Sequence, residues 1–447
     1  MKKVLVANRG EIAVRIIRTL KEMNIQTVAI YSTADASDLH VALADESYCI
    51  GPPEAKASYL NIAAIIKVAK ATGADAIHPG YGFLSENSAF ARQCELNKIT
   101  FIGPSSEIIS FMRDKVSARE IMKEIGLPVI PGSGAVIEDR ESLIKVTEEI
   151  GFPIIIKATS GRGGKGIRIV HDEKNLIESF DACVQEADAL FGDSRMYIEK
   201  FISGARHIEV QIIGDGEGKV VHLFERDCSI QRNYQKLIEE APATALTEKQ
   251  RDEICLLACE VFSKLKYEGA GTVEFLYVEK SNQFYFMEMT PGLQAGHTIT
   301  EEITGIDIVK TQIEVASGKG LPVNQEAIKL KGFALQCRIN AEDPENNFRP
   351  STGAISRLHL GLGRNTRIDT HLYMNYVMPS YYDSLLAKII VSDTTRARTI
   401  GRMKIVLEET VIEPITTNLD FQYQLLHQIN YKENKISTKF LEENDFI

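Results

Sequence analysis

Apolar positions follow two different periods in the first part of the chain. Four short segments are rich in apolar residues and are typical of buried strands: 3–7, 27–31, 74–78 and 100–102. Three longer segments repeat apolar residues every three or four positions, as one face of a helix does: 11–23, 60–71 and 89–97. Strand–helix alternation with short loops predicts an α/β unit with a doubly wound parallel sheet at residues 1–112.

A second α/β unit follows, between two glycine-containing breaks at 131–134 and 203–204. A helix is expected at 114–125, just before it. Within it, the pattern predicts strands at 154–157, 167–170 and 196–200 and a helix near 174–189. We expect this unit, at about 132–203, to be a mobile lid within a domain spanning 113–330. The same domain is expected to contain a strand at 207–213, a helix at 247–264 and a hairpin at 271–289. Beyond residue 331 the apolar runs are short, which predicts a β-rich C-terminal domain at 331–447.

Two carboxylates interrupt the apolar runs of the predicted hairpin. Strand alternation predicts that Glu274 lies on the same side as Thr272, and Glu288 on the same side as Phe286 and Thr290. A carboxylate flanked by core residues is costly to bury unless it is paired or bound to a cation. Two such groups on neighbouring strands therefore indicate a Mg²⁺ site completed by phosphate oxygens and water. Taken alone, a solvated edge hairpin explains the pattern equally well.

A glycine-rich segment supplies the second half of this hypothesis. The predicted strand 154–157 delivers Lys157, and the loop 158–166 carries glycines, Arg162 and Lys165 before the next strand. Glycines allow backbone N–H groups to approach phosphate oxygens closely, and the lysines add positive charge. The loop leads into a strand, so it is neither a Walker A loop nor a Rossmann fingerprint. Together with the two carboxylates it indicates an ATP-grasp site.

Composition narrows the function classes. The 447 residues carry a formal net charge of −10, which argues against a broad phosphate-binding surface, so we expect no nucleic-acid partner. No apolar run approaches the length of a membrane span. The seven cysteines are scattered without metal-site spacing, and a reducing cytoplasm is expected.

Several long motifs make the resemblance to a known family specific. They occupy residues 7–13 (ANRGEIA), 78–87 (HPGYGFLSEN), 101–104 (FIGP), 206–211 (RHIEVQ), 225–229 (ERDCS), 239–242 (EEAP) and 337–344 (CRINAEDP). The chain resembles the biotin carboxylase subunit of bacterial acetyl-CoA carboxylase. The resemblance implies an ATP-grasp fold and ATP-dependent carboxylation of biotin by bicarbonate, with two Mg²⁺ or Mn²⁺ ions. No Met-Lys-Met segment is present to carry biotin, so a separate biotin carboxyl carrier protein and carboxyltransferase subunits are the expected partners. A homodimer is also expected.

The resemblance also assigns roles to individual residues. The ATP phosphates are expected to contact Lys115, Lys157, Gly163, Gly164, Lys165 and Gly166. The rest of the nucleotide is expected to lie against Glu199, Lys200, Ile202, His207, Gln231 and Tyr234. The metals are assigned to Glu274, Glu288 and Thr290, and the bicarbonate and biotin site to Lys236, Gln294 and Arg338. Structural alternatives stay open: a solvated Lys115, an ordinary buried His207, and an Arg338 that forms a domain-bridging ion pair.

The chain departs from the family pattern around this same site. Thr290 replaces an asparagine, Gly292 replaces the arginine that faces biotin, and Gly296 replaces the glutamate that accepts the bicarbonate proton. Further departures are Arg113, Arg162 and Tyr234. We expect residues 292, 294 and 296 to share one side of a strand, and we expect low turnover because glycine supplies neither base nor cation. The alternatives are an ATP-binding pseudoenzyme or regulatory subunit of a carboxylase complex, and an ATP-grasp ligase with another acceptor.

Overall fold

The computed structural model describes residues 1–137, 139–159 and 166–446. The N-terminal part is a five-stranded parallel sheet of order β3-β2-β1-β4-β5. Its strands are β1 (Lys3–Val6), β2 (Gln26–Ser32), β3 (Glu46–Gly51), β4 (Ala76–His78) and β5 (Thr100–Phe101). Its helices are α1 (Gly10–Glu22), α2 (Leu39–Leu43), α3 (Ile62–Thr72), α4 (Ser88–Leu96) and α5 (Ser106–Arg113). The α/β fold class predicted from the sequence is confirmed.

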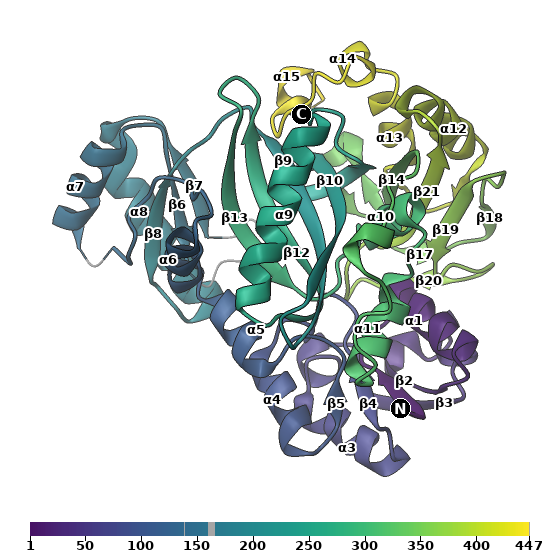
Figure 1. Cartoon of the computed structure of the whole chain (residues 1–447). Helices are drawn as coiled ribbons and strands as arrows, with labels where there is room; N and C mark the ends of the chain where they lie inside the picture. The colour runs from purple at the N-terminus through teal and green to yellow at the C-terminus, as the bar shows by residue number, and fades with distance from the viewer. Residues whose placement is uncertain (138, 160–165, 447) are drawn as a thin grey trace.

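A small three-stranded unit stands apart from the rest of the molecule, on the left of Figure 1. It contains α7 (Arg140–Ile150), β6 (Ile154–Ala158), β7 (Ile167–Val170), α8 (Leu176–Phe191) and β8 (Met196–Lys200), and α6 (Lys115–Ile125) lies beside it. The strand order is β7-β6-β8, and the unit has its own apolar core, which includes Leu143, Ile156, Phe180 and Ile198. A separate core is what a lid needs in order to move as one body, and we refer to residues 132–203 as the lid.

One sheet of eight strands runs through the centre of the molecule, in the order β13-β12-β9-β10-β11-β14-β21-β19. The strands are β9 (Arg206–Asp215), β10 (Val220–Arg232), β11 (Gln235–Ala241), β12 (Glu268–Val278), β13 (Gln283–Pro291), β14 (Phe333–Asn340), β19 (Thr366–Thr370) and β21 (Leu385–Asp393). The expectation of only short strands beyond residue 331 is wrong for β14 and β21, which have 8 and 9 residues. These two strands continue the sheet because both are mostly buried and pair along nearly their whole length.

Helices cover this sheet, and short elements complete the C-terminal part. The larger helices are α9 (Glu248–Lys264), α10 (His297–Thr304), α11 (Ile308–Ala316) and α12 (Arg396–Glu409). The short helices are α13 (Leu419–Leu425), α14 (Ile429–Lys432) and α15 (Phe440–Glu443), and the short strands are β15 (Glu342–Asp343), β16 (Arg349–Pro350), β17 (Gly353–Ala354), β18 (Arg357–His359), β20 (Val377–Met378) and β22 (Val411–Glu413). The C-terminus returns to the central sheet near β9 and β10 (Figure 1). In the described part of the chain, the helices are too short or too polar to cross a membrane.

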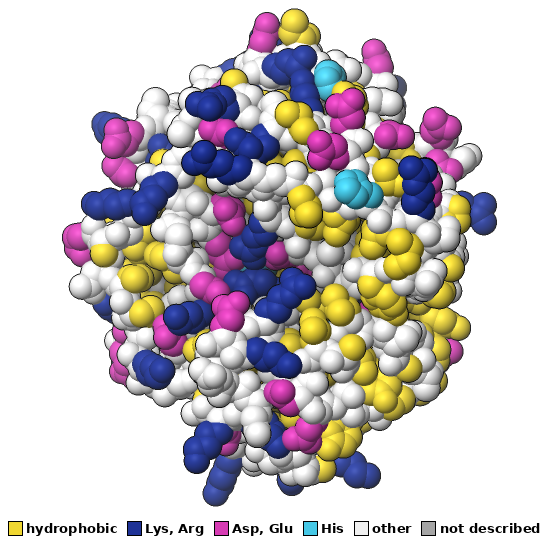
Figure 2. All heavy atoms as spheres, turned by 90° about the vertical axis from the view of Figure 1, so that its right-hand side faces the viewer, with side chains coloured by type: hydrophobic (Ala, Val, Ile, Leu, Met, Phe, Trp, Pro, Cys, Tyr) yellow, Lys and Arg dark blue, Asp and Glu magenta, His cyan; other side chains and the backbone are white. Residues whose placement is uncertain are grey.

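The surface carries both signs of charge. On the face shown in Figure 2, lysine and arginine side chains are interspersed with carboxylates, while apolar side chains gather on one half of that face. Large exposed apolar side chains of the C-terminal part include Leu362, Met374, Val377 and Ile405.

Candidate nucleotide-binding and catalytic site

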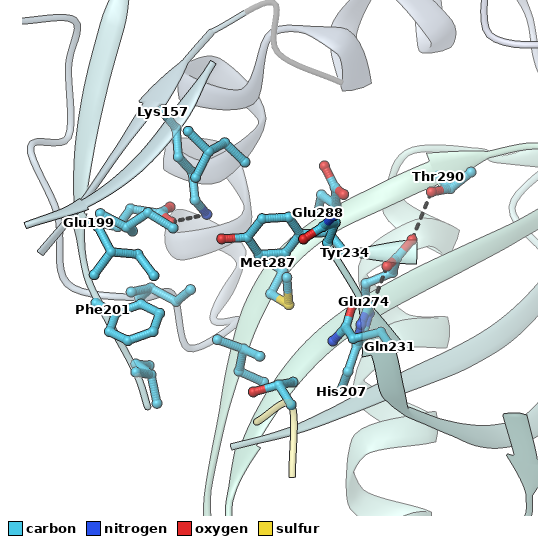
Figure 3. Close-up of a pocket in the computed structure, with 18 of the residues that line it drawn as sticks. Lys157, Glu199, Phe201, His207, Gln231, Tyr234, Glu274, Met287, Glu288 and Thr290 are labelled. Atoms are coloured by element: carbon cyan, nitrogen blue, oxygen red, sulfur yellow. Dashed lines mark hydrogen bonds and ion pairs between the residues drawn. The ribbon is translucent and has the colours of Figure 1, made fainter. Parts of the chain in front are cut away.

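A cavity of about 700 Å³ lies between the lid and the central sheet (Figure 3). This volume is in the range of sites that bind nucleotides and other small ligands. The lid contributes Lys157, Glu199, Lys200, Phe201 and Ile202, and the sheet contributes His207, Gln231, Lys236, Glu274, Met287 and Glu288. The cavity thus brings together the predicted lid residues and the predicted carboxylate pair.

The lid side presents a buried ion pair. Nζ of Lys157 lies 2.6 Å from Oε2 of Glu199, and Oε1 of the same carboxylate lies 3.7 Å from Nη1 of Arg119; Glu199 is only 3% exposed. The strands β6 and β8 place the pair, because Lys157 and Glu199 lie close to each other on neighbouring strands, Lys157 opposite Tyr197 and Glu199 opposite Ile155. The Lys200 ammonium turns away and donates to the carbonyls of Gly151 and Phe152. Of these two lysines, Lys157 is therefore the one whose ammonium faces the cavity.

Four side chains contact Glu274 on the sheet side of the cavity. Its Oε1 accepts from Thr290 Oγ1 at 2.8 Å and from Gln294 Nε2 at 2.7 Å. Its Oε2 lies 2.7 Å from Nε2 of His207 and 3.6 Å from Nζ of Lys236. Burial opposes ionisation of Glu274, but Lys236 and His207 outweigh it and hold the pKa of the carboxyl well below its usual range. Glu274 is therefore a carboxylate at neutral pH.

Glu288 reaches the cavity by a route that simple alternation does not give. Glu274 pairs with Glu288, but the next residue, Phe275, pairs with Phe286, so Met287 is an extra residue in β13. This β-bulge turns Phe286 into the core that contains Phe275 and Met289 while Glu288 faces the cavity. The prediction that Glu288 and Phe286 share a side is wrong for this reason. The bulge also adds Met287 to the cavity lining, which regular strand alternation does not predict.

The carboxylates provide ligands suited to a hard divalent cation. Glu274 and Glu288 lie directly opposite each other, with the Thr290 hydroxyl beside them and an open cavity for phosphate oxygens. His207, Glu209 and Glu274 form a further buried group whose ligand atoms lie within 4.8 Å of one another. Lys236 contacts both carboxylates of that group and Arg226 pairs with Glu209, so two cations already offset its two negative charges. The donor set therefore fits a cation between Glu274 and Glu288 better than one beside Glu209.

Both cations expected at the bicarbonate and biotin site are paired with buried glutamates. Lys236 forms an ion pair with Glu209, and Arg338 makes a bidentate contact with Glu239 at 2.9 Å and 2.7 Å. Burial lowers the pKa of Lys236, but Glu209, Glu274 and other anionic groups nearby together outweigh it and raise the pKa well above its usual range, so the ammonium stays protonated. Neither Glu209 nor Glu239 was singled out from the sequence, although both lie in quoted motifs. Both side chains are completely buried, and the sequence alone does not show this burial.

The segment 292–296 is not a strand. β13 ends at Pro291, Gly292 has a φ of 125°, and Gly296 is the residue before α10. The prediction that residues 292, 294 and 296 share one side of a strand is therefore wrong, because the positive φ at Gly292 breaks the extended backbone. A Cβ atom on Gly296 would lie 2.6 Å from Oε1 of Glu239 and 3.0 Å from Nε of Arg226. The site of a side chain at 296 is thus already occupied by an ion-paired carboxylate.

The remaining predicted residues divide into two groups. Gln231 and Tyr234 line the cavity, as does Arg113 at the end of α5, and Gly166 begins the described chain after the loop. Lys115 begins α6, and its side chain lies outside the described part of the structure. Arg162, Gly163, Gly164 and Lys165 also lie outside the described residues.

The C-terminal end of the chain also reaches the cavity, which was not predicted. Thr438, Lys439, Leu441 and Glu442 line it. The amide of Thr438 donates to the carbonyl of Ala205 at 2.9 Å, which fixes the segment to the start of β9. No local sequence pattern predicts this contact, because it depends on where the last helix packs against the rest of the molecule.

Comparison with known proteins places the chain in a family. Three family models match in order: biotin carboxylase N-terminal domain at 1–109, carbamoyl-phosphate synthase L chain ATP-binding domain at 114–324, and biotin carboxylase C-terminal domain at 336–443. The chain is 49% identical to biotin carboxylase 1 of Bacillus subtilis (strain 168) over 445 residues, covering 100% of this chain and 99% of the relative. It is 47% identical to biotin carboxylase of Pseudomonas aeruginosa, covering 99% and 98%.

Solved structures agree with this placement. The biotin carboxylase domain dimer of Hydrogenobacter thermophilus 2-oxoglutarate carboxylase, bound to MgADP, ADP and bicarbonate, is 44% identical, with a TM-score of 0.97, over 100% of this chain and 98% of that chain. The biotin carboxylase of Campylobacter jejuni in complex with β,γ-ATP is 46% identical, with a TM-score of 0.97 and 99% coverage of both chains. The chain therefore belongs to the biotin carboxylase family, a family of ATP-dependent ligases that carboxylate biotin.

Proposed function

We propose that this chain binds MgATP in the cavity and carboxylates biotin on a separate carrier protein with bicarbonate, at a low rate. The observation that carries the proposal is the meeting of Lys157 with the facing carboxylates of Glu274 and Glu288 around one cavity. Related structures contain ADP, Mg²⁺ and bicarbonate, or β,γ-ATP, which supports the same ligands here.

In this proposal the residues act by binding and by charge. Lys157 holds phosphate oxygens, together with Lys115 and the glycine loop, while Glu274 and Glu288 hold one or two Mg²⁺ or Mn²⁺ ions that offset the phosphate charge. A bicarbonate oxygen attacks the γ-phosphorus of ATP and ADP leaves. The carboxyphosphate formed then transfers its carboxyl group to biotin, which loses a proton, and phosphate is released. Lys236, Arg338 and Gln294 border the site of that transfer.

The low rate follows from two missing side chains. Gly296 supplies no carboxylate to accept the bicarbonate proton, and loss of a general base costs about 10²–10⁴-fold in rate. Gly292 supplies no cation opposite the charge that develops on biotin, which costs roughly another 10²–10³-fold. Arg338 does not replace it freely, because its guanidinium is held by Glu239.

A second candidate, an ATP-binding pseudoenzyme or regulatory subunit of a carboxylase complex, is favoured by the same two glycines. A third, an ATP-grasp ligase for another acceptor, would use the space beside Gly292, where a Cβ atom would meet nothing within 4 Å. Incubation with labelled bicarbonate, MgATP and biotinylated carrier protein separates them. Slow, ATP-dependent labelling of the carrier supports the main proposal. ATP binding with no labelling after long incubation supports the pseudoenzyme, and bicarbonate-independent ADP release with another acceptor supports the third.

The proposed setting is cytoplasmic fatty acid biosynthesis, with acetyl-CoA as the final acceptor and a carboxyltransferase as partner. It is supported by the resemblance of the motifs to acetyl-CoA carboxylase subunits. Relatives that are 44% identical include a pyruvate carboxylase subunit of Methanothermobacter thermautotrophicus and the 2-oxoglutarate carboxylase small subunit of Hydrogenobacter thermophilus. Reconstitution with each carboxyltransferase would distinguish these acceptors. The dimeric Hydrogenobacter structure supports a homodimer, which sedimentation would test.

A further inference from the structure

A fully buried lysine lies behind the 292–296 segment. Nζ of Lys388 is 3.3 Å from the carbonyl oxygen of Ala295 and 3.2 Å from Oε2 of Glu11. Asp369 is the second anion, at 4.0 Å, and the Lys388 side chain is 0% exposed. One ammonium group therefore joins the first helix, the C-terminal strands and the segment that follows β13.

The strand register explains how the lysine reaches this position. Lys388 on β21 lies directly opposite Arg338 on β14 and Asp369 on β19. Directly opposite residues of an antiparallel pair project from the same face of a sheet. α10, which begins at His297, packs on β14 and β21. The row of residues that includes Arg338, which pairs with Glu239, therefore also brings Lys388 to Ala295, two residues before α10.

The segment has other anchors besides Lys388: Leu293 is 2% exposed within an apolar core, and Arg226 donates to Oε1 of Gln294 at 3.4 Å. Gly292 and Gly296 have no side chains, and the imidazole Nδ1 of His297 lies 2.6 Å from the carbonyl oxygen of Gln294. The Gln294 side chain in turn donates to Oε1 of Glu274. Glu274 and Arg226 thus hold the Gln294 side-chain amide, while His297 and Lys388 hold the backbone carbonyls of Gln294 and Ala295 behind it.

We propose that Lys388, with Glu11 as its counter-ion, is a positioning residue that fixes the 292–296 segment and through it the Gln294 amide on Glu274. The role of Glu274 as a metal ligand rests on the proposed function. The contact between Lys388 and the carbonyl of Ala295 is independent of that function. Burying a lysine is costly unless it is paired, so removal of Glu11 also weakens the hold on Ala295.

The groups around Glu11 make the contact responsive to pH. Tyr81 donates to Glu11 from the loop after β4, Lys388 faces it from β21, and Arg367 and Asp369 act on it from β19. Burial raises the pKa of Glu11 to about 7, against the opposing effect of Lys388. Below that pH Glu11 becomes neutral, and Lys388 retains only the more distant Asp369.

Hydrogen exchange in the nucleotide-free full chain tests the proposal, so its outcome is independent of whether ATP binds. We expect the amides of residues 292–297 to exchange about tenfold faster in Lys388→Met, with α9 as the internal reference. Arg396→Met is the matched control, because it breaks a buried ion pair with Glu240 that does not touch the segment. Unchanged exchange at 292–297 in Lys388→Met, or an equal increase in the control, would overturn the proposal.

A second arm requires no lysine variant, in case Lys388→Met does not fold. In the unaltered chain we expect protection of 292–297, corrected for intrinsic exchange, to be about fivefold weaker at pH 6 than at pH 8. Glu11→Gln should remove this pH dependence and leave protection at the weaker level. A pH dependence that persists in Glu11→Gln would contradict the assignment, since a group other than Glu11 would then control the exchange of the segment.

Discussion

Glu274 and Glu288 lie directly opposite each other on β12 and β13, next to the bulge at Met287 in β13, and both line the cavity. The two carboxylates differ in their surroundings. Glu274 is buried and contacted by four side chains, whereas Glu288 is only partly buried. Placing a cation between them would relieve their repulsion, so metal and nucleotide should bind together.

Glu288→Ala should therefore weaken nucleotide binding only when metal is present. We expect the Kd for MgATP, measured by calorimetry, to rise at least about tenfold, because one carboxylate ligand is lost. Binding of ATP in EDTA should change little. Glu268→Gln is the matched control, since it lies at the start of β12 and does not line the cavity. A Kd that rises equally with and without metal would show that Glu288 acts on the nucleotide without a metal.

Nucleotide should close the lid as one body. The lid has its own apolar core, and Lys157 faces the cavity from β6. Lids that close over phosphates exclude water and protect their backbone. We expect amide exchange in β6 and β7 to slow several-fold on addition of MgATP, while exchange in the N-terminal sheet stays constant. Equal exchange with and without MgATP would count against closure.

Buried neutral histidines should make the fold sensitive to acid. Burial, with Arg15 nearby, lowers the pKa of His78 from 6.5 to about 3. As pH falls, His78 is protonated in the unfolded chain before it is protonated in the folded chain. The neutral imidazole therefore contributes its full stabilisation of the fold above pH 6.5, and this contribution is lost as pH falls toward 3. His222 and His371, with pKa values lowered to about 4 by burial, act in the same direction.

His78→Asn removes the contribution of His78 to this acid sensitivity. The asparagine side-chain oxygen can still accept the hydrogen bond that the Gly80 N–H donates to Nδ1 of His78. Between about pH 6.5 and about pH 5, the unaltered chain should lose about 1.5 kcal/mol more unfolding free energy than the variant. Urea unfolding at the two pH values gives the difference. An identical loss in both proteins would mean that His78 is protonated in the folded state.

Much of the fold was predictable from periodicity, since it reflects local patterns. The lid strand Met196–Lys200 was predicted to the residue, and most other predicted bounds lie within one or two residues. β3 was not predicted because three of its six residues are exposed and carry no apolar run. The lengths of β14 and β21 were underestimated, because these strands pair with strands that lie far away in the sequence.

The site was predictable as a set of residues but not as a geometry. Alternation assumes a regular strand, and the bulge at Met287 and the positive φ at Gly292 both break that assumption. Glycine is compatible with either conformation, so the sequence alone did not reveal the turn at 292–296. The pairing of Arg338 with Glu239 depends on neighbouring strands that lie far apart in the sequence.

Restoring the two missing side chains should restore activity. We expect Gly292→Arg with Gly296→Glu to raise biotin-dependent ADP release at least about 10²-fold, and either change alone to give much less, because both groups act in one reaction. Arg162→Gly is a useful third change. The positive φ at Gly292 and the contact of position 296 with Glu239 should make the double variant less stable, by about 1–3 kcal/mol. A stable double variant that binds MgATP but stays inactive would favour the pseudoenzyme.

The rate of ADP release by the unaltered chain, with MgATP and bicarbonate and with or without biotin, tests the central claim most directly. The claim is that the nucleotide site is intact while the groups that drive carboxyl transfer are missing at Gly292 and Gly296. It predicts saturable binding of MgATP together with a biotin-dependent rate near background. A biotin-dependent rate of about 1–10³ s⁻¹, typical of enzymes, would contradict it, because another residue would then have to supply the base and the cation.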